Sequence, residues 1–227
     1  MSINKGVFLK QMVYLRRHDY QVMSLEEAVE AMRTGRRVPD NRVALTFDDG
    51  HRDFYEIAYP IIKTYRYNVT AFIFTDLLEK ESGYLTWSEL KELQKDSLVE
   101  IGAHSISHKP LTRLSHSEAE REIVMSKSLL EERLGKPVTL FAYPFGALNE
   151  SIKEVVKESG YTAAVGTAYR RGEFKDEDVY ILKRVFVSKL SRYPFIYRFM
   201  LSGYYVPARE LILRILNIRT PRDAMNY

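Results

Sequence analysis

Segments with helical periodicity alternate with short β-branched and aromatic runs through most of this 227-residue chain. Apolar residues recur at helical spacing from Val7 to Arg17, and strand-like runs follow at 43–47, 69–74, 98–103, 138–143, 162–165 and 181–187. Strands that are separated by helices form parallel sheets, because each connection has to cross back over the sheet. The chain is therefore expected to be an α/β protein with roughly six parallel strands, fewer than a complete (β/α)8 barrel has.

Capping signals predict where several of the helices begin. Boxes of the Ser/Thr-x-x-Glu type occur at 24–27, 86–89 and 117–120. In such a box the first side chain accepts a hydrogen bond from the backbone N–H three residues on, and the glutamate bonds back to the cap. The helix after Ser117 is expected to end at Gly135, since glycine tolerates the left-handed conformation of a C-terminal cap.

The composition excludes several classes of function. The chain has no cysteine, so disulfides, thiolate zinc sites and cysteine nucleophiles are ruled out. Its net charge is +4, and basic and acidic residues are interleaved through most of the chain, so a nucleic-acid partner is not expected. No apolar run has the length of a bilayer span, and the N-terminus does not resemble a signal peptide. A cytoplasmic or membrane-peripheral location is the default expectation.

Two acids and two histidines follow separate strand-like runs. Asp48 and Asp49 end the run at 43–47, and Gly50 then turns the chain; His104 and His108 come directly after the run at 98–103. The carboxyl ends of parallel strands meet at one edge of a sheet, so these side chains are expected to lie together. Two histidines and one carboxylate would bind a metal with coordination positions left open, and the second carboxylate would be free to act as a base.

The same residues allow other interpretations. An Asp-Asp-Gly sequence is often a solvated turn, and two histidines four residues apart are often ordinary surface or core residues. Two histidines and a carboxylate are also the facial triad of non-haem iron oxygenases, although those sites usually lie in antiparallel barrels. A further strand-end turn, Tyr143-Pro144-Phe145-Gly146, is either an ordinary β-turn or part of the site.

The segments Thr46–Gly50, His104–His108 and Phe141–Gly146 resemble three motifs of the polysaccharide deacetylase family, carbohydrate esterase family 4, with the chitooligosaccharide deacetylase homology domain. The third segment is similar to the branch that acts on exopolysaccharides, and the likeness covers about residues 20–190. It implies a distorted, incomplete (β/α)7 barrel that hydrolyses N-acetyl groups from N-acetylhexosamine residues. It also implies a divalent metal, with Zn²⁺ the first choice and Co²⁺, Ni²⁺ or Mn²⁺ the alternatives, and it makes the cell envelope an alternative location.

The resemblance assigns a role to each site residue. Asp48 becomes the general base, and Asp49, His104 and His108 become the metal ligands. The backbone N–H of Phe145 would help to hold the oxyanion. The remaining residues expected to contact the N-acetylated glycan are Tyr143, Pro144, Leu182 and Arg184.

The chain departs from the family pattern at several positions. Ala142 stands where relatives commonly have an arginine that steadies the base, and Leu182-Lys183-Arg184 lacks the usual general-acid histidine. The only tryptophan, Trp87, fits a helix start better than the family's groove motif. The strand that usually precedes the first helix in relatives is missing before this one, so the barrel is expected to lack one of the usual strands. The alternative function is therefore a catalytically weak domain that binds glycan, and the proton donor for the leaving amine stays open.

The last part of the chain lies beyond this resemblance. Residues 1–190 are expected to form the catalytic domain, and 191–227 a basic, amphipathic helical extension that Gly203 and Pro207 divide. These helices would either pack on the barrel or make peripheral contact with an anionic membrane.

Overall fold

The computed structural model describes residues 3–166, 178–187 and 189–202. Its single sheet contains six strands in the order β1-β2-β3-β4-β5-β6, and every pair of neighbours is parallel. The strands are β1 (Gln21–Met23), β2 (Arg42–Phe47), β3 (Val69–Ile73), β4 (Val99–Ala103), β5 (Leu140–Ala142) and β6 (Ala163–Val165). The α-helices are α1 (Lys5–Arg17), α2 (Leu25–Arg33), α3 (Tyr59–Tyr65), α4 (Trp87–Leu93), α5 (His116–Leu134), α6 (Glu150–Glu158) and α7 (Pro194–Leu201).

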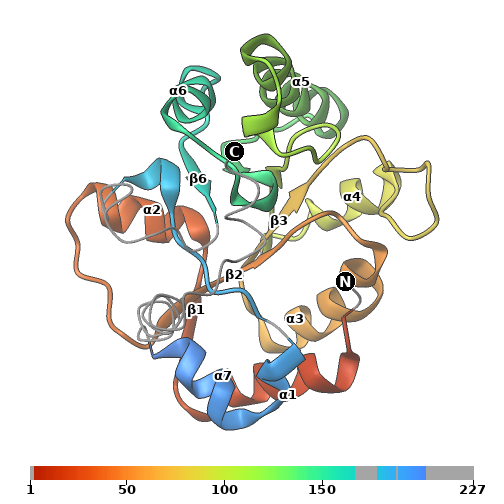
Figure 1. Ribbon diagram of the computed structural model, residues 1–227. Coiled ribbons are helices and arrows are strands. Elements are labelled where there is room, and N and C mark those ends of the chain that lie inside the picture. Colours follow the sequence, from red (N-terminus) through yellow and green to blue (C-terminus); the bar gives the residue numbers. More distant parts are fainter. Residues whose placement is uncertain (1–2, 167–177, 188, 203–227) are drawn as a thin grey trace.

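The sheet curls, and the helices surround it from the outside (Figure 1). The central strand β3 is buried at all five positions, as expected for a parallel strand covered on both faces. Packing there leaves little room: a Cβ at Gly102 of β4 would approach the Phe72 ring to 2.5 Å. The predicted incomplete, distorted (β/α) barrel is thus confirmed, and an open side remains between β1 and β6, the two edge strands of the described sheet.

Most of the predicted helix starts are confirmed. Ser24 and Thr86 each form a complete capping box, and Gly135 ends α5 with φ 69°. The prediction at Ser117 was wrong by two residues. Ser115 is the N-cap, and its capping box closes on Glu118, so the Ser-x-x-Glu pattern that counts lies just upstream of the predicted one.

The predicted number of strands was right, but one predicted strand does not form and one observed strand was not predicted. Residues 21–23 form β1, which the sequence analysis did not predict, because a three-residue strand has no visible alternation. Residues 181–187 were expected to be a strand, yet only Leu182 pairs with the sheet, through an isolated parallel bridge to Val165. A short 3-10 helix, Val179–Ile181, precedes that bridge.

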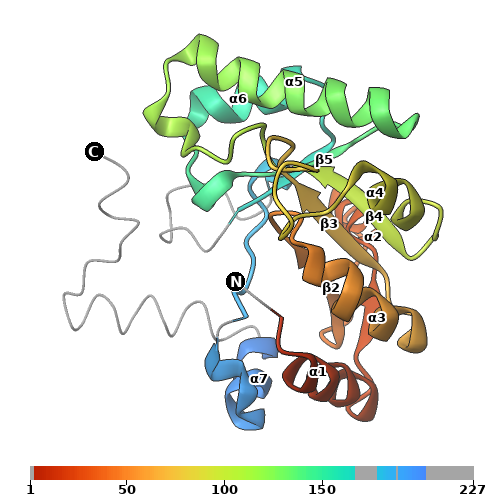
Figure 2. The same cartoon turned by 90° about the vertical axis from the view of Figure 1, so that its right-hand side faces the viewer.

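The last described helix of the chain lies beside the first. Helix α7 lies next to α1 at the edge of the molecule (Figure 2), with Tyr197 and Met200 buried. Within the described residues, no helix is both long enough and apolar enough to span a bilayer. The predicted second helix of the extension, beyond Gly203, lies outside the described residues, and the division into 1–190 and 191–227 stays a prediction.

Candidate metal centre and active site

A tight turn after β2 separates the two acids. Asp49 and Gly50 both have left-handed backbones, with φ 76° and 72°, and the Gly50 carbonyl accepts a hydrogen bond from the Leu85 N–H at 3.0 Å. A Cβ at Gly50 would lie 3.2 Å from Cδ1 of Ile73, so the position requires glycine for both space and conformation. The turn lets Asp48 and Asp49 face different partners at the same strand end.

Asp49 meets the two predicted histidines. Its Oδ1 lies 3.2 Å from His108 Nε2 and 3.5 Å from His104 Nε2, and all three ligand atoms lie within 4.8 Å of one another. The buried His104 ring points its Nδ1 at the Ala142 carbonyl oxygen, 2.7 Å away. That contact fits a ring with the proton on Nδ1, which leaves the Nε2 lone pair available to a metal.

The loop that carries His108 does not form a helical turn. Ser105 and His108 both have positive φ, 65° and 56°, and the loop is held from outside by Glu122 of α5. Glu122 Oε2 accepts hydrogen bonds from the N–H groups of Ile106 at 2.9 Å and Ser107 at 2.8 Å. Glu122 was not predicted from the sequence, because nothing in a helical Glu-Arg-Glu stretch distinguishes an acid that binds a distant loop.

Asp48 is held by a single arginine. Arg184 Nη1 and Nη2 donate to the two oxygens of the Asp48 carboxylate, each at 2.7 Å. The same guanidinium donates to the Thr46 hydroxyl at 3.0 Å and, through Nε, to the Gly166 carbonyl at 3.0 Å. From the sequence, Arg184 was expected to contact substrate, and Ala142 stands where relatives commonly have an arginine. Arg184 approaches Asp48 from another part of the chain and places a positive charge beside it.

Charge and burial set the protonation states in the site. Burial by itself raises the pKa of the Asp49 carboxyl, but its contacts with the His104 and His51 rings, together with the electrostatic effect of the neighbouring histidines, hold this pKa well below its usual range. Burial also raises the pKa of Asp48, and the Arg184 charge and hydrogen bonds outweigh it, so the net pKa is lowered. Burial and the neighbouring His104 lower the pKa of His108. Near pH 7 these shifts leave Asp48 and Asp49 ionised and His108 neutral.

The remaining predicted residues lie around this centre. Phe145 has φ 58° and is 41% exposed, and its ring centroid lies 4.6 Å from that of His108. Tyr143 is only 1% exposed, and its hydroxyl donates to the Tyr180 carbonyl at 2.9 Å, so its side chain supports the turn from below. Pro144 is buried as well. Leu182 packs against a small apolar cluster next to β6. Contact of these residues with substrate stays a prediction.

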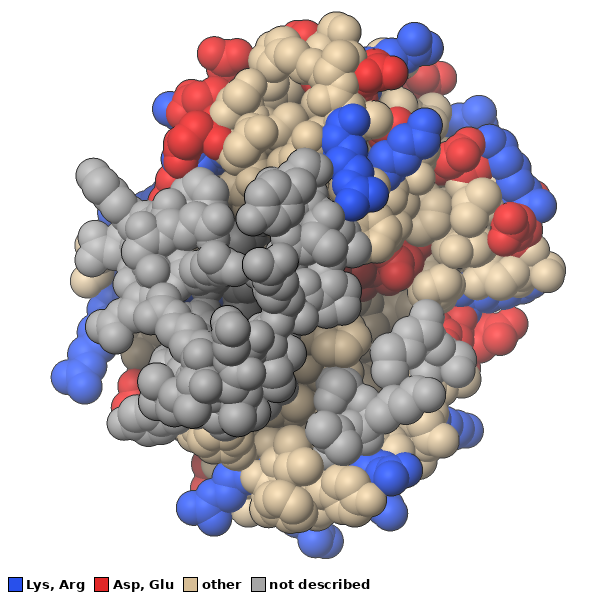
Figure 3. Space-filling model, viewed as in Figure 1, with Lys and Arg blue, Asp and Glu red and all other residues tan. Residues whose placement is uncertain are grey.

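The donor set fits a divalent transition metal. Imidazole nitrogens and a carboxylate oxygen suit zinc and its neighbours, and three protein ligands leave room for water and substrate. In Figure 3, acidic side chains lie at the floor of a hollow near the centre of the molecule. His51 flanks the group, with its Nε2 3.5 Å from Asp49 Oδ2 and its ring stacked on Tyr84.

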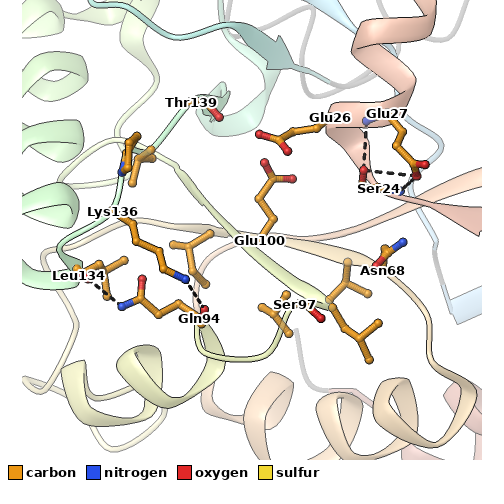
Figure 4. A pocket seen from close by; sticks show the side chains of 16 residues that line it. Ser24, Glu26, Glu27, Asn68, Gln94, Ser97, Glu100, Leu134, Lys136 and Thr139 are labelled. Carbon is orange, nitrogen blue, oxygen red and sulfur yellow. Dashed lines mark hydrogen bonds between the residues drawn. The ribbon is translucent and has the colours of Figure 1, made fainter.

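A second cavity has none of these residues in its wall. Its volume is about 630 Å³, and it is lined by residues of α2, β4 and the segment before β5. Glu26 and Glu100 point their carboxyl groups toward each other across it (Figure 4), and the Thr70 hydroxyl donates to Glu100 at 3.1 Å. Burial and the Glu26 charge raise the pKa of Glu100 to about 7.

Comparison with known proteins identifies the family of this chain. The sequence profile of the polysaccharide deacetylase family matches residues 35–164. The Bacillus subtilis protein YxkH is 29% identical over 191 residues, which cover 83% of this chain and 66% of the relative. A poly-β-1,6-N-acetyl-D-glucosamine N-deacetylase of Staphylococcus aureus is 28% identical over 171 residues, 70% of this chain and 59% of the relative. The chain thus spans less than two thirds of the length of either relative.

Solved structures agree with this likeness. The Streptococcus pyogenes deacetylase PplD, solved in complex with acetate, has a TM-score of 0.74 and 26% identity, and the match covers 86% of each chain. IcaB from Ammonifex degensii has a TM-score of 0.76 at 23% identity, covering 88% of this chain and 90% of that one, which shows a shared fold. Because the family profile covers more than half of its residues, this chain belongs to the polysaccharide deacetylase family.

Proposed function

We propose that this chain is a metal-dependent hydrolase that removes N-acetyl groups from N-acetylhexosamine residues of a polysaccharide, oligosaccharide or glycolipid. The observation that carries the proposal is that the two neighbouring aspartates have different partners. Asp49 faces His104 and His108, while Asp48 faces Arg184. A metal-binding site with a separate base beside it is what metal-assisted amide hydrolysis uses. The name of the Staphylococcus aureus relative supports the N-acetylated glycan as substrate.

Asp49, His104 and His108 would hold the metal, with zinc as the first choice. When bound, a divalent metal polarises the amide carbonyl and lowers the pKa of water, so that a nucleophile is available at neutral pH. The protein contributes the fixed orientation of each ligand: the Ala142 carbonyl sets the His104 ring, and Glu122 holds the loop before His108.

Asp48 takes the proton of the attacking water. Its lowered pKa keeps it ionised in the resting protein, and the Arg184 fork prevents the carboxylate from rotating toward the metal ligands. The backbone N–H of Phe145, at the exposed turn after β5, would donate to the oxyanion as the water oxygen bonds to the carbonyl carbon.

The carbon–nitrogen bond then breaks, and acetate and a free amine leave. The leaving nitrogen needs one proton, and the Asp48 carboxyl carries the one that it has just accepted. In this proposal Asp48 therefore accepts the proton from water and later donates it to the leaving nitrogen. No histidine is then needed as a proton donor, and Leu182-Lys183-Arg184 contains none. Arg184 itself is a poor acid, because a guanidinium does not release its proton in proteins.

Two other functions fit the observations less well. An iron oxygenase triad usually lies in an antiparallel double-sheet barrel, whereas every strand pair of this sheet is parallel. A catalytically weak glycan-binding domain would need no base, yet Asp48 accepts two hydrogen bonds from Arg184. Two further hydrogen bonds, to Thr46 and Gly166, hold the Arg184 guanidinium in place.

The test compares Asp48→Asn with Asp49→Asn, using acetate release from an N-acetylglucosamine oligomer and metal content measured on the same samples. Asp48→Asn should keep its metal and lose roughly two to four orders of magnitude in turnover, as for a lost general base. Asp49→Asn should lose the metal. The opposite pattern would mean that the two acids have exchanged roles, and wild-type protein that binds the oligomer without releasing acetate would favour the binding-domain alternative.

A further inference from the structure

Helix α7 turns two phenylalanine side chains to solvent. Phe195 is 72% exposed and Phe199 is 42% exposed, and their four-residue spacing puts both on one face of the helix. Tyr197 and Met200 occupy the opposite face and are buried. Burying large apolar side chains is favourable, so this exposed pair needs a reason.

The helix is fixed firmly enough to present that face. The Tyr197 ring packs edge-on against Tyr14 of α1, with ring centroids 5.5 Å apart. Just before the helix, the buried Ser191 hydroxyl accepts a hydrogen bond from Gln11 Nε2 at 2.8 Å. Figure 2 shows α7 beside α1 at the edge of the molecule farthest from α5 and α6. The outward direction of Phe195 and Phe199 therefore follows from how the other face is anchored.

Cations lie close to these rings in the sequence. From residue 185 to residue 202 the sequence contains no aspartate or glutamate, and it contains Lys189, Arg192 and Arg198. The guanidinium of Arg192 lies 4.9 Å from the Tyr193 ring, which is 42% exposed. Arg198 is exposed on α7 itself. In Figure 3, tan side chains with blue ones beside them occupy the lower edge, where α7 lies in Figure 1.

We propose that the α7 face, defined as Tyr193, Phe195 and Phe199 with Arg192 and Arg198, docks peripherally on a bilayer that contains anionic phospholipid. Exposed aromatic rings flanked by cations match the two parts of such a surface: the rings enter the region between headgroups and acyl chains, and the cations meet the phosphates. A second copy of the chain is a poorer occupant, because a symmetric interface would bring the same cations together with no acid between them.

Sedimentation with vesicles tests this surface in the full chain. Protein should sediment with vesicles of phosphatidylcholine and phosphatidylglycerol at low salt, and much less with phosphatidylcholine alone or at high salt. Arg192→Gln and Arg198→Gln should each weaken partitioning by about fivefold, the equivalent of about 1 kcal/mol per cation near an anionic surface. Phe195→Ser with Phe199→Ser should weaken it further at every salt concentration, because that change removes the apolar part.

Matched controls lie on other helices. Met125→Ser removes an apolar side chain that is 47% exposed on α5, and Lys91→Gln removes an exposed cation on α4; neither should alter vesicle binding. Acetate release from a soluble oligomer should stay unchanged in all α7 variants, which separates this proposal from the proposed activity. The proposal fails if intact protein ignores anionic vesicles, or if the Phe195/Phe199 variant binds as well as wild type. It also fails if the Phe195/Phe199 variant melts several degrees lower than wild type, because the chain itself would then cover the α7 face. It fails as well if the protein sediments without vesicles and the variant does not, because a second copy would then cover that face.

Discussion

Arg184→Met isolates the contact between the proposed base, Asp48, and Arg184. Methionine preserves much of the apolar stem and removes the guanidinium, so the Asp48 carboxylate loses both of its 2.7 Å hydrogen bonds. The contacts of the guanidinium with the Thr46 hydroxyl and the Gly166 carbonyl are lost at the same time. Everything on the Asp49 side of the site is untouched, so metal content should stay at the wild-type level.

The structural cost follows from the burial of the pair. Removing one partner of a fully buried ion pair typically costs about 3–5 kcal/mol. Here the Arg184 side chain is 16% exposed and the Asp48 side chain 32%, so water can reach the carboxylate that is left. We expect a loss of about 2 kcal/mol in the free energy of unfolding, which corresponds to roughly 4–8 °C in Tm for a chain of this length.

The catalytic cost should be larger. A base displaced by about 1 Å can lose on the order of 100-fold in rate, so kcat for acetate release should fall by about that factor. KM should change little, because Arg184 donates to protein groups in the structure. Loss of the Arg184 charge also removes the largest of the influences that lower the pKa of Asp48. That pKa rises in the variant, so the acidic limb of the kcat/KM profile should move to higher pH.

Two controls separate positioning from simple damage. Thr46→Val removes one acceptor of Arg184 and leaves the carboxylate fork intact, so kcat should stay within about tenfold of wild type, as for one lost hydrogen bond. In an Asp48→Asn background, Arg184→Met should cost much less stability than it does alone. If Arg184→Met instead raises KM at unchanged kcat, Arg184 contacts substrate and the positioning role is refuted.

Three further perturbations address other parts of the structure. Glu122→Ala frees the loop before His108 and should weaken metal affinity by about 10–100-fold, measured by competition with a chelator. Glu100→Gln tests the second cavity: because burial and Glu26 raise the folded-state pKa of Glu100 to about 7, wild type binds a proton on folding and loses stability as pH rises from about 4.5 through 7. The variant should therefore melt about 4–8 °C above wild type at pH 8, a difference of about 2 kcal/mol, and equal it near pH 4. Phe145→Gly should retain kcat within about tenfold, whereas Phe145→Pro, which has no N–H and cannot adopt φ 58°, should lose about 10²–10³-fold with metal content unchanged.

Short-range sequence patterns predicted the features that depend on residues close together in the chain. Capping boxes at Ser24 and Thr86 begin helices as expected, since the bonds involved span three residues. The two acids and two histidines were expected at one sheet edge because parallel strands end there, and the structure brings Asp49, His104 and His108 together. This grouping depends only on strand direction, which the alternation of helices and strands fixes.

Features that depend on distant partners were not predictable. Arg184 lies 136 residues beyond Asp48, and the bridge at Leu182 that brings it to the site is too short to appear as a strand pattern. Glu122 resembles any other helical acid until its loop partners are known. The edge strand β1 has three residues and forms only because β2 offers it a free edge. In each case the determining contact joins residues whose spacing in the sequence carries no periodic signal.

The central claim is that acetate release depends on a metal held by Asp49, His104 and His108. Its most direct test is to strip the protein with a chelator, measure residual metal, and follow acetate release from an N-acetylglucosamine oligomer while Zn²⁺ is titrated back. Activity should be absent in the stripped protein and should return in proportion to the metal bound, reaching its plateau at one ion per chain, with Co²⁺ as a second metal to compare. Full activity in protein shown to be free of metal would contradict the account.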